Sequence, residues 1–273
     1  MSRQISKDTQ LCISLAGRPS NIGTHFHNFL YEELGLDFVY KAFTTSDLSA
    51  AIAGIRGLGI RGCGVSMPYK EACIPYLDEL DASAKALQSV NTIVNDKGRL
   101  RAYNTDYIAV RKLLDRQEVS HSLSIVIHGS GGMAKAVAGA LYDAGFRTGI
   151  VLARNQEAGV QLADNYGYEW RQQLSDLRPG LLVNCTPIGM AGGAEAETLA
   201  FPPDVIDSAE MVFDVVAMPP ETPLISYART QGKPVITGAE VIALQAAEQF
   251  ALYTGVRPTE AQIQRASEYA RGS

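Results

Sequence analysis

A glycine-rich turn between an apolar run and a helical stretch constrains the fold of this chain more than any other feature. It follows the largely apolar residues 123–127 and opens a helical pattern over residues 133–144. Spacing of this kind lets the backbone turn tightly, approach a pyrophosphate and pack helix against strand, while the helix N-terminus offers N–H groups to phosphate. The sequence therefore predicts a dinucleotide-binding βαβ unit. Its cofactor-binding residues are expected to be Gly129, Ser130, Gly131, Gly132, Met133 and Ala134.

The end of the next apolar run bears on which dinucleotide binds. Residues 149–152 predict a strand, and Arg154 and Asn155 follow it, with no Asp or Glu at that strand end. An acid at this position normally holds the ribose hydroxyls of NAD. An arginine can instead stack on adenine and pair with a 2′-phosphate. We therefore expect Arg154 and Asn155 to bind the cofactor, and the cofactor to be NADP.

Short apolar runs alternate with helical patterns along most of the chain. Non-alternating apolar strands in repeated βα units indicate parallel sheets covered on both faces. One antiparallel element is expected, because Asn95-Asp96-Lys97-Gly98 is a hairpin signal. Ser46 is the expected N-cap of the second helix. Expected strands cover residues 11–15, 38–43, 62–66, 90–94, 99–103, 123–127, 149–152, 181–184, 211–216 and 234–236; expected helices cover 25–34, 46–58, 107–116, 133–144, 157–166, 241–253 and 259–270.

Composition argues against several classes of protein. The formal charge is -5 without a long basic run, which disfavours nucleic acid as a partner. No apolar run approaches a membrane span, and the N-terminal residues lack the apolar core of a secretory signal. The cysteines have no CxxC spacing and the histidines form no ligand cluster with them, so we expect no metal and a cytoplasmic protein with reduced thiols. These cysteines are Cys12, Cys63, Cys73 and Cys185.

Several short segments together resemble the shikimate dehydrogenase family, over nearly the whole chain and in the right order. The resemblance rests on Gly62-Cys63-Gly64-Val65-Ser66-Met67-Pro68-Tyr69-Lys70, Val90-Asn91-Thr92, Asn104-Thr105-Asp106, Asn184-Cys185-Thr186-Pro187-Ile188-Gly189-Met190, Pro219-Pro220-Glu221-Thr222-Pro223-Leu224, and Gly238 with Gln245-Ala246. It implies a two-domain α/β enzyme. Residues 1–106 and 240–273 would form a substrate domain with a mostly parallel sheet, to which the last helices return. Residues 107–239 would form an NADP-binding Rossmann domain.

The resemblance also implies an activity and its catalytic pair. The family reversibly reduces 3-dehydroshikimate to shikimate in a cleft between the domains, with a Lys and an Asp that match Lys70 and Asp106. The chemistry is sensible because exchanging an alcohol and a ketone moves a hydride and a proton, and a lysine beside an aspartate can handle the proton. The resemblance adds Thr186, Val215 and Gly238 to the expected cofactor site.

Expected substrate contacts follow the family pattern in part. Asn91 and Gln245 match positions that bind the substrate's hydroxyls, and Ser66 keeps the hydroxyl of a family threonine. Where the family has two carboxylate-binding serines, this chain has Asn21 and Gly23. Thr24 is expected to supply a hydroxyl there.

Two further departures lie in the expected cleft. Gly64 replaces a usual Asn, and Ala217 replaces a frequent Tyr. Losing one such hydrogen bond costs on the order of 1–3 kcal/mol. We therefore expect slow turnover of shikimate, or a shifted ring acid such as quinate.

Alternatives stay open at this point. The chain can be a quinate dehydrogenase that uses NAD or NADP, or a dinucleotide-binding sensor that has lost catalysis. Retention of Lys70 and Asp106 argues against a sensor, which needs neither. The only partner expected is a small ring acid, and both a monomer and a homodimer fit the sequence.

Overall fold

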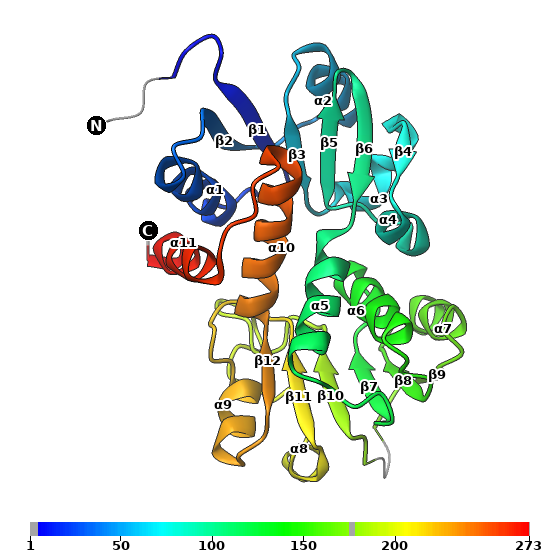
Figure 1. Ribbon diagram of the computed structural model, residues 1–273. Helices are drawn as coiled ribbons and strands as arrows, with labels where there is room; N and C mark the ends of the chain where they lie inside the picture. Colours follow the sequence, from blue (N-terminus) through cyan, green and yellow to red (C-terminus); the bar gives the residue numbers. More distant parts are fainter. Residues whose placement is uncertain (1–4, 175–177, 273) are drawn as a thin grey trace. The chain divides into compact units, whose positions relative to one another are not determined.

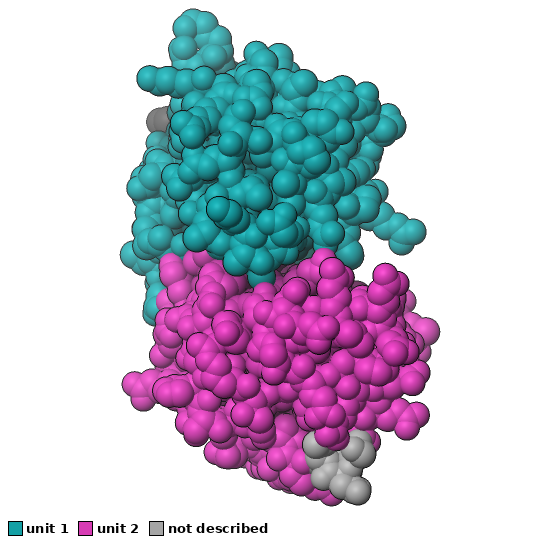
Figure 2. Space-filling model, turned by 90° about the vertical axis from the view of Figure 1, so that its right-hand side faces the viewer, with its two compact units in different colours: residues 1–105, 243–273 teal, residues 106–242 magenta. Residues whose placement is uncertain are grey.

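The computed structural model describes residues 5–174 and 178–272, and the chain divides into two compact units. Figure 2 colours them teal and magenta. Unit 1 comprises Met1–Thr105 and Ala243–Ser273, and unit 2 comprises Asp106–Ile242. The chain leaves unit 1 at the start of α5 (Thr105–Arg116) and returns within α10 (Gly238–Thr254). Thr105, the first residue of α5, is the last residue of this part of unit 1, and the rest of the helix, from Asp106 on, belongs to unit 2.

Unit 1 is built on a mixed six-stranded sheet with the order β2-β1-β3-β5-β6-β4. Its strands are β1 (Gln10–Leu15), β2 (Phe38–Phe43), β3 (Gly62–Val65), β4 (Glu79–Leu80), β5 (Thr92–Asp96) and β6 (Arg99–Tyr103). β1 pairs in parallel with β2 and β3, whereas β5 is antiparallel to β3 and β6. The β5–β6 hairpin confirms the turn signal in the sequence.

Helices cover both faces of this sheet (Figure 1). Successive residues of a strand point to opposite faces, and Cys12 and Ile13 accordingly enter different apolar clusters. One cluster includes residues of α2 (Leu48–Gly57) and α4 (Ala82–Leu87). The other includes residues of α1 (Ile22–Glu33), α10 and α11 (Glu260–Gly272), so the last two helices complete the core of unit 1. Two short elements, α3 (Tyr69–Ala72) and the 3-10 helix η1 (Ile74–Tyr76), follow β3.

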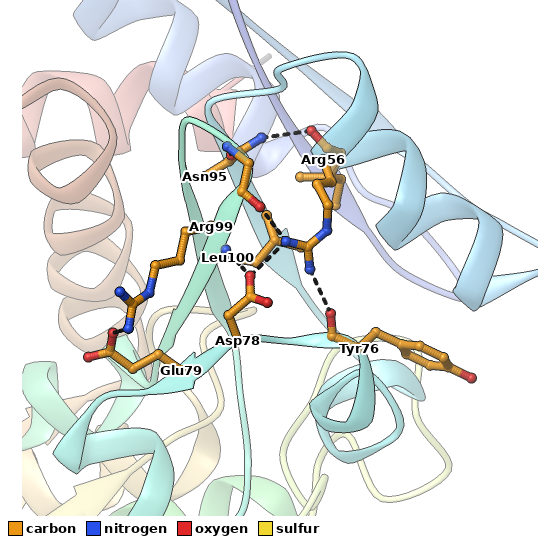
Figure 3. Close-up of polar contacts among 9 residues, drawn as sticks. Arg56, Tyr76, Asp78, Glu79, Asn95, Arg99 and Leu100 are labelled. Carbon is orange, nitrogen blue, oxygen red and sulfur yellow. Dashed lines mark hydrogen bonds and ion pairs between the residues drawn. The ribbon is translucent and has the colours of Figure 1, made fainter.

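A charged cluster joins α2 to the hairpin (Figure 3). The Arg56 guanidinium donates to Oδ2 of Asp78 at 2.7 Å, to the carbonyl of Tyr76 at 3.3 Å and to the carbonyl of Gly98. Asp78 also accepts the Leu100 N–H at 2.6 Å, and the Arg56 guanidinium lowers the pKa of its carboxyl group. These hydrogen bonds connect α2, η1 and the hairpin turn, and they pair the charges of Arg56 and Asp78 within unit 1.

Unit 2 has a wholly parallel sheet with the order β12-β11-β10-β7-β8-β9. The strands are β7 (Ile125–His128), β8 (Gly149–Leu152), β9 (Glu169–Arg171), β10 (Leu181–Asn184), β11 (Met211–Asp214) and β12 (Val235–Thr237); the remaining helices are α6 (Gly132–Asp143), α7 (Gln156–Asp164), α8 (Pro203–Ser208) and α9 (Pro223–Thr230). This is the Rossmann strand order, with its switch point between β7 and β10. The expected fold class is confirmed.

Some local expectations were wrong. The N-cap of α2 is Asp47 rather than Ser46, because the Asp47 carboxylate accepts the Ala50 N–H at 2.9 Å. α1 begins at Ile22 rather than near His25, so Gly23 and Thr24 lie in its first turn. Across the described ranges, no helix combines the length and the apolar character that crossing a bilayer requires.

A close approach in unit 1 requires glycine at position 62. A Cβ atom added there would overlap the Tyr253 ring of α10, whereas one added at Gly54 in α2 would meet nothing within 4 Å. We expect Gly62→Ala to lower the free energy of unfolding by about 1–3 kcal/mol, because the buried ring must move. The control Gly54→Ala should raise it by up to about 1 kcal/mol. Urea unfolding measures both, and equal stability of the native chain and Gly62→Ala would contradict the packing.

Candidate functional site

Three of the family-like segments are hydrogen-bonded to one another in unit 1. The Val90 N–H donates to the Lys70 carbonyl at 2.8 Å, and the Thr105 N–H donates to Oδ1 of Asn91 at 2.7 Å. Because a backbone N–H must meet an oxygen, the Thr105 bond fixes which way the Asn91 carboxamide points. No described residue accepts a hydrogen bond from Nδ2 of Asn91. This buried side chain therefore has a donor available for a ligand.

A polar cluster surrounds Asn91. The hydroxyls of Thr92 and Thr105 donate to its Oδ1 at 2.8 and 3.1 Å. Nε2 of Gln249 donates to the Asn91 carbonyl at 3.1 Å, and Oγ1 of Thr105 lies 3.3 Å from Oε1 of Gln245. The structure thus brings the expected Asn91 and Gln245 together. Sequence reasoning missed Thr105 and Gln249, although Gln249 lies four residues after Gln245 and so on the same face of α10.

The expected carboxylate contacts lie at the start of α1. Asn21 is the N-cap residue, but its side chain makes no capping bond. The first N–H groups of a helix lack intrahelical partners, so this turn can bind an anion. Oγ1 of Thr24 is buried without a partner among the described residues. Ser66 lies at the carboxyl end of β3, is exposed, and has no described partner for its hydroxyl.

Tyr40 fills the space beside both glycines that depart from the family pattern. A Cβ added at Gly64 would lie 2.9 Å from the Tyr40 hydroxyl, and one added at Gly23 would lie 3.8 Å from it. The Tyr40 ring stacks on His27, with centroids 4.4 Å apart and planes at 9°. Burial lowers the pKa of His27 to about 3, so the imidazole is neutral in the folded chain. A longer side chain at position 64 would require this pair to move.

The expected catalytic residues come from different units. Lys70 is half-buried at the second position of α3, in unit 1. Asp106 is largely buried in the first turn of α5, where unit 2 begins, and it follows the anchored Thr105 directly. Their meeting stays a prediction.

The glycine-rich turn of unit 2 fits a dinucleotide. Gly129 has φ +119° and a Cβ there would lie 3.0 Å from the Cys185 carbonyl oxygen, so only glycine suits this turn. Gly131 caps α6 without a side-chain bond, and a Cβ at Gly131 or Gly132 would meet nothing within 4 Å. The first N–H groups of α6 are therefore open to a phosphate. Ser130 and Met133 lie in the same turn, and Ala134 is fully buried.

The residues after β8 suit an adenosine 2′-phosphate. Arg154 is exposed and forms no hydrogen bond or ion pair with the described residues. Asn155 is the N-cap of α7, and its Oδ1 accepts the Ala158 N–H at 3.0 Å. Only its amide group therefore stays available to a cofactor.

A hydrogen-bond network shapes the loops after β10 and β11. The buried Asp214 carboxylate accepts from Nδ2 of Asn184 at 3.0 Å, from the Val216 N–H at 3.0 Å and from the Thr222 hydroxyl at 2.6 Å. Burial raises the pKa of Asp214 to about 6, although all three hydrogen bonds oppose that shift. Oδ1 of Asn184 accepts from the N–H and hydroxyl of Thr186 at 3.0 and 2.6 Å.

The remaining expected cofactor residues adjoin this network. Val215 donates its N–H to the Asn184 carbonyl at 3.0 Å. A Cβ added at Gly238 would overlap the backbone of Val215 and Val216, so the start of α10 packs directly on that loop. Ala217 follows in the same loop. Within residues 5–174 and 178–272, no three His, Cys, Asp or Glu side chains are grouped as a metal site requires.

The raised pKa of Asp214 links stability to pH. The pKa rises from 3.8 to about 6 on folding, so folding favours the neutral acid. This contribution, about 3 kcal/mol, is fully present below the unfolded pKa and is lost as pH rises through the folded pKa. Asp214→Asn, which does not titrate, is the reference. From pH 7 to pH 4, just above the unfolded pKa, the unfolding free energy of the native chain should rise by about 2 kcal/mol relative to the variant; a constant difference would contradict the assignment.

Comparisons with known proteins show which sequences this chain resembles. The family model described as the shikimate dehydrogenase substrate binding domain matches residues 22–93. A shikimate dehydrogenase-like protein of Haemophilus influenzae is 57% identical, over 98% of this chain and 98% of its own. A shikimate dehydrogenase (NADP(+)) of Pyrococcus abyssi is 34% identical, over 93% of this chain and 96% of its own.

Solved structures give the same result. The shikimate 5-dehydrogenase of Thermus thermophilus, in complex with NADP(H) and shikimate, matches with TM-score 0.86 and 28% identity, over 96% of this chain and 99% of its own. The quinate dehydrogenase of Corynebacterium glutamicum, in complex with NAD, matches with TM-score 0.89 and 27% identity, over 97% and 99%. Since relatives 57% and 34% identical match over almost their full length, the chain belongs to the shikimate dehydrogenase family of oxidoreductases.

Proposed function

We propose that the chain is an NADP-dependent oxidoreductase that interconverts shikimate and 3-dehydroshikimate, or a close ring acid. The observation that carries this proposal is the junction in unit 1, where Asn91 is bonded to Thr105 and its neighbour Val90 to Lys70. The segment of Val90 and Asn91 therefore presents the Nδ2 donor of Asn91, and it is hydrogen-bonded to the backbone of Lys70, which carries the ammonium group. A hydroxylated ring acid needs this combination of hydrogen-bond donors and a proton-transfer group.

In the proposal, the chain's own residues hold the proton at the reacting oxygen and bind the ring acid. A nicotinamide cofactor supplies or accepts the hydride when bound. In the proposal, the Lys70 ammonium holds the proton at the reacting oxygen, and Asp106 orients it. Asn91, Gln245 and Ser66 bind ring hydroxyls. The first turn of α1, with Asn21 and Thr24, binds the carboxylate.

The choice of NADP rests on the end of β8. Arg154 is exposed there without a described partner, and no acid stands beside it to hold a ribose hydroxyl. A guanidinium matches the planar geometry of phosphate oxygens. The Pyrococcus relative carries NADP(+) in its name, which supports the same choice.

A second ring acid is favoured by the substituted positions. Gly23, Gly64 and Ala217 offer no polar side chain, and the Tyr40 hydroxyl occupies the space beside the first two. A site with fewer donors recognises a different hydroxyl pattern. Quinate is the candidate, and the structural match to a quinate dehydrogenase supports it.

A panel of ring acids with each dinucleotide tests substrate and cofactor together. We expect NADP to be reduced in the presence of shikimate or quinate, with slow turnover or weak saturation by shikimate. The formation of NADPH at 340 nm measures the rates. Shikimate turnover as fast as a biosynthetic enzyme would contradict the shifted substrate, and no turnover of any ring acid would contradict the proposed activity.

Replacing the proposed proton carrier separates catalysis from binding. Lys70→Ala should lower kcat by about 10²–10⁴-fold, because positioned proton transfer contributes that much. The dissociation constant for NADP should stay unchanged. Lys85→Ala, an exposed lysine of α4 in the same unit, is the control. Native kcat in Lys70→Ala would rule out the catalytic assignment.

Removing the guanidinium after β8 tests cofactor choice. Arg154→Ala should lower kcat/KM for NADP by about 10–100-fold, the value of one or two charge-assisted hydrogen bonds, and leave kcat/KM for NAD nearly unchanged. Arg229→Ala in α9, whose guanidinium pairs with Glu221 at 3.2 Å, controls for loss of a surface arginine. An equal loss for both cofactors would show that Arg154 does not read the 2′-phosphate.

A further inference from the structure

We propose that Asp214 is a positioning residue that holds the loops after β10 and β11 in the shape that receives the nicotinamide half of the cofactor. The inference rests on the proposed use of NADP and adds a residue to its machinery. Asp214 ends β11, is fully buried, and accepts hydrogen bonds from three residues, one at the end of β10 and two in the loop after β11.

All three groups around Asp214 donate to its carboxylate. They are an amide NH₂, a backbone N–H and a hydroxyl, all neutral, and no described lysine or arginine pairs with the carboxylate. Burying a carboxylate among neutral groups is costly unless its oxygens are hydrogen-bonded. Here Oδ1 accepts two bonds and Oδ2 accepts one. A purely structural position would be filled at lower cost by an apolar residue, so the arrangement indicates that the loop shape itself is needed.

One arm of the network runs into the loop after β10. Nδ2 of Asn184 donates both to Asp214 and, at 3.1 Å, to the Ile188 carbonyl. Oδ1 of Asn184 binds Thr186, whose hydroxyl accepts the Ile188 N–H at 3.2 Å. Asp214 thus orients the carboxamide that folds residues 184–188 into a closed turn. This turn also adjoins the glycine-rich motif, since the Cys185 N–H donates to the His128 carbonyl at 2.8 Å.

The other arms hold the loop after β11. The Val216 N–H donates directly to Asp214, and the backbone of Val216 packs on Gly238. The Thr222 hydroxyl donates to Asp214 and accepts the Ile225 N–H at 3.2 Å, which caps α9. The Ala191 N–H donates to the Met218 carbonyl at 2.9 Å, so the two loops are also joined to each other.

The strand order says which half of a dinucleotide these loops face. Arg154 follows β8, on one side of the switch point between β7 and β10, whereas Asp214 ends β11 on the other side. A dinucleotide binds across that crevice with its pyrophosphate at the turn after β7. With the adenosine at Arg154, the nicotinamide half lies at the loops after β10 and β11. Losing the Asp214 network should therefore affect one half of the ligand only.

Two ligands separate the two halves. Titration calorimetry measures the dissociation constants of NADP⁺ and of adenosine 2′,5′-bisphosphate, which lacks the nicotinamide half. Asp214→Val, which fits a strand end but accepts no hydrogen bond, should weaken NADP⁺ binding by about tenfold or more and leave bisphosphate binding within about twofold. Asp214→Asn should largely retain NADP⁺ binding, because its oxygen can accept at Oδ1 while its NH₂ donates to Thr222. Asp207→Val, at an exposed carboxylate of α8, should change neither constant.

A second pair of variants keeps the inference testable if Asp214→Val does not fold. Thr222→Val removes one arm without changing the side-chain shape, and it should weaken NADP⁺ binding selectively; Thr222→Ser should restore it. Equal weakening of both ligands, or unchanged NADP⁺ binding in a folded Asp214→Val or Thr222→Val, overturns the positioning role. If the native chain binds NAD but not NADP⁺, the proposed cofactor is wrong. This outcome is distinct from failure of the positioning role, because it is measured on the native chain and not on a variant.

Discussion

The Thr105 N–H lies 2.7 Å from Oδ1 of Asn91, at the residue where the chain leaves unit 1 for unit 2. This bond fixes the carboxamide of Asn91 and anchors the residue before Asp106. Its partners are deeply buried, so breaking it would leave an unsatisfied polar group in the core at a cost of about 1–3 kcal/mol. The proposed binding of the ring acid by Asn91 therefore depends on a hydrogen bond from Thr105, the last residue of unit 1 before the chain enters unit 2.

Sequence patterns predict the parts of the fold that bury apolar residues regularly. β8 and β10 were predicted to the residue because apolar side chains make up most of each strand and turns flank them. β9, with Glu169 and Arg171, was missed because a three-residue edge strand carries no such pattern. The first turn of α1 was missed because Gly23 and Thr24 have weak helix propensity, and tertiary contacts override it.

The site was predictable only where a short motif marks it. Asn91 and Gln245 stand in recognisable segments, and the structure brings them together through Thr105. Gln249 was not predicted, because its partners lie more than 150 residues away in the chain. The same holds for Tyr40: no spacing along the sequence shows that its hydroxyl fills the space beside Gly64. The role of Asp214 was not predicted, because it depends on three hydrogen-bond donors that no pattern in the sequence places beside it.

The two units use polar side chains in opposite ways. In unit 2, Asn184, Asp214 and Thr222 satisfy one another, and the turn of Gly129 and Gly131 presents backbone N–H groups. A closed network of this kind specifies the shape of a loop. In unit 1, Nδ2 of Asn91 and the Ser66 hydroxyl have no partner among the described residues. Open donors select a ligand by its own hydroxyls. Under the proposed function, substitutions in unit 1 would therefore change the ring acid without disturbing the binding of the dinucleotide by unit 2.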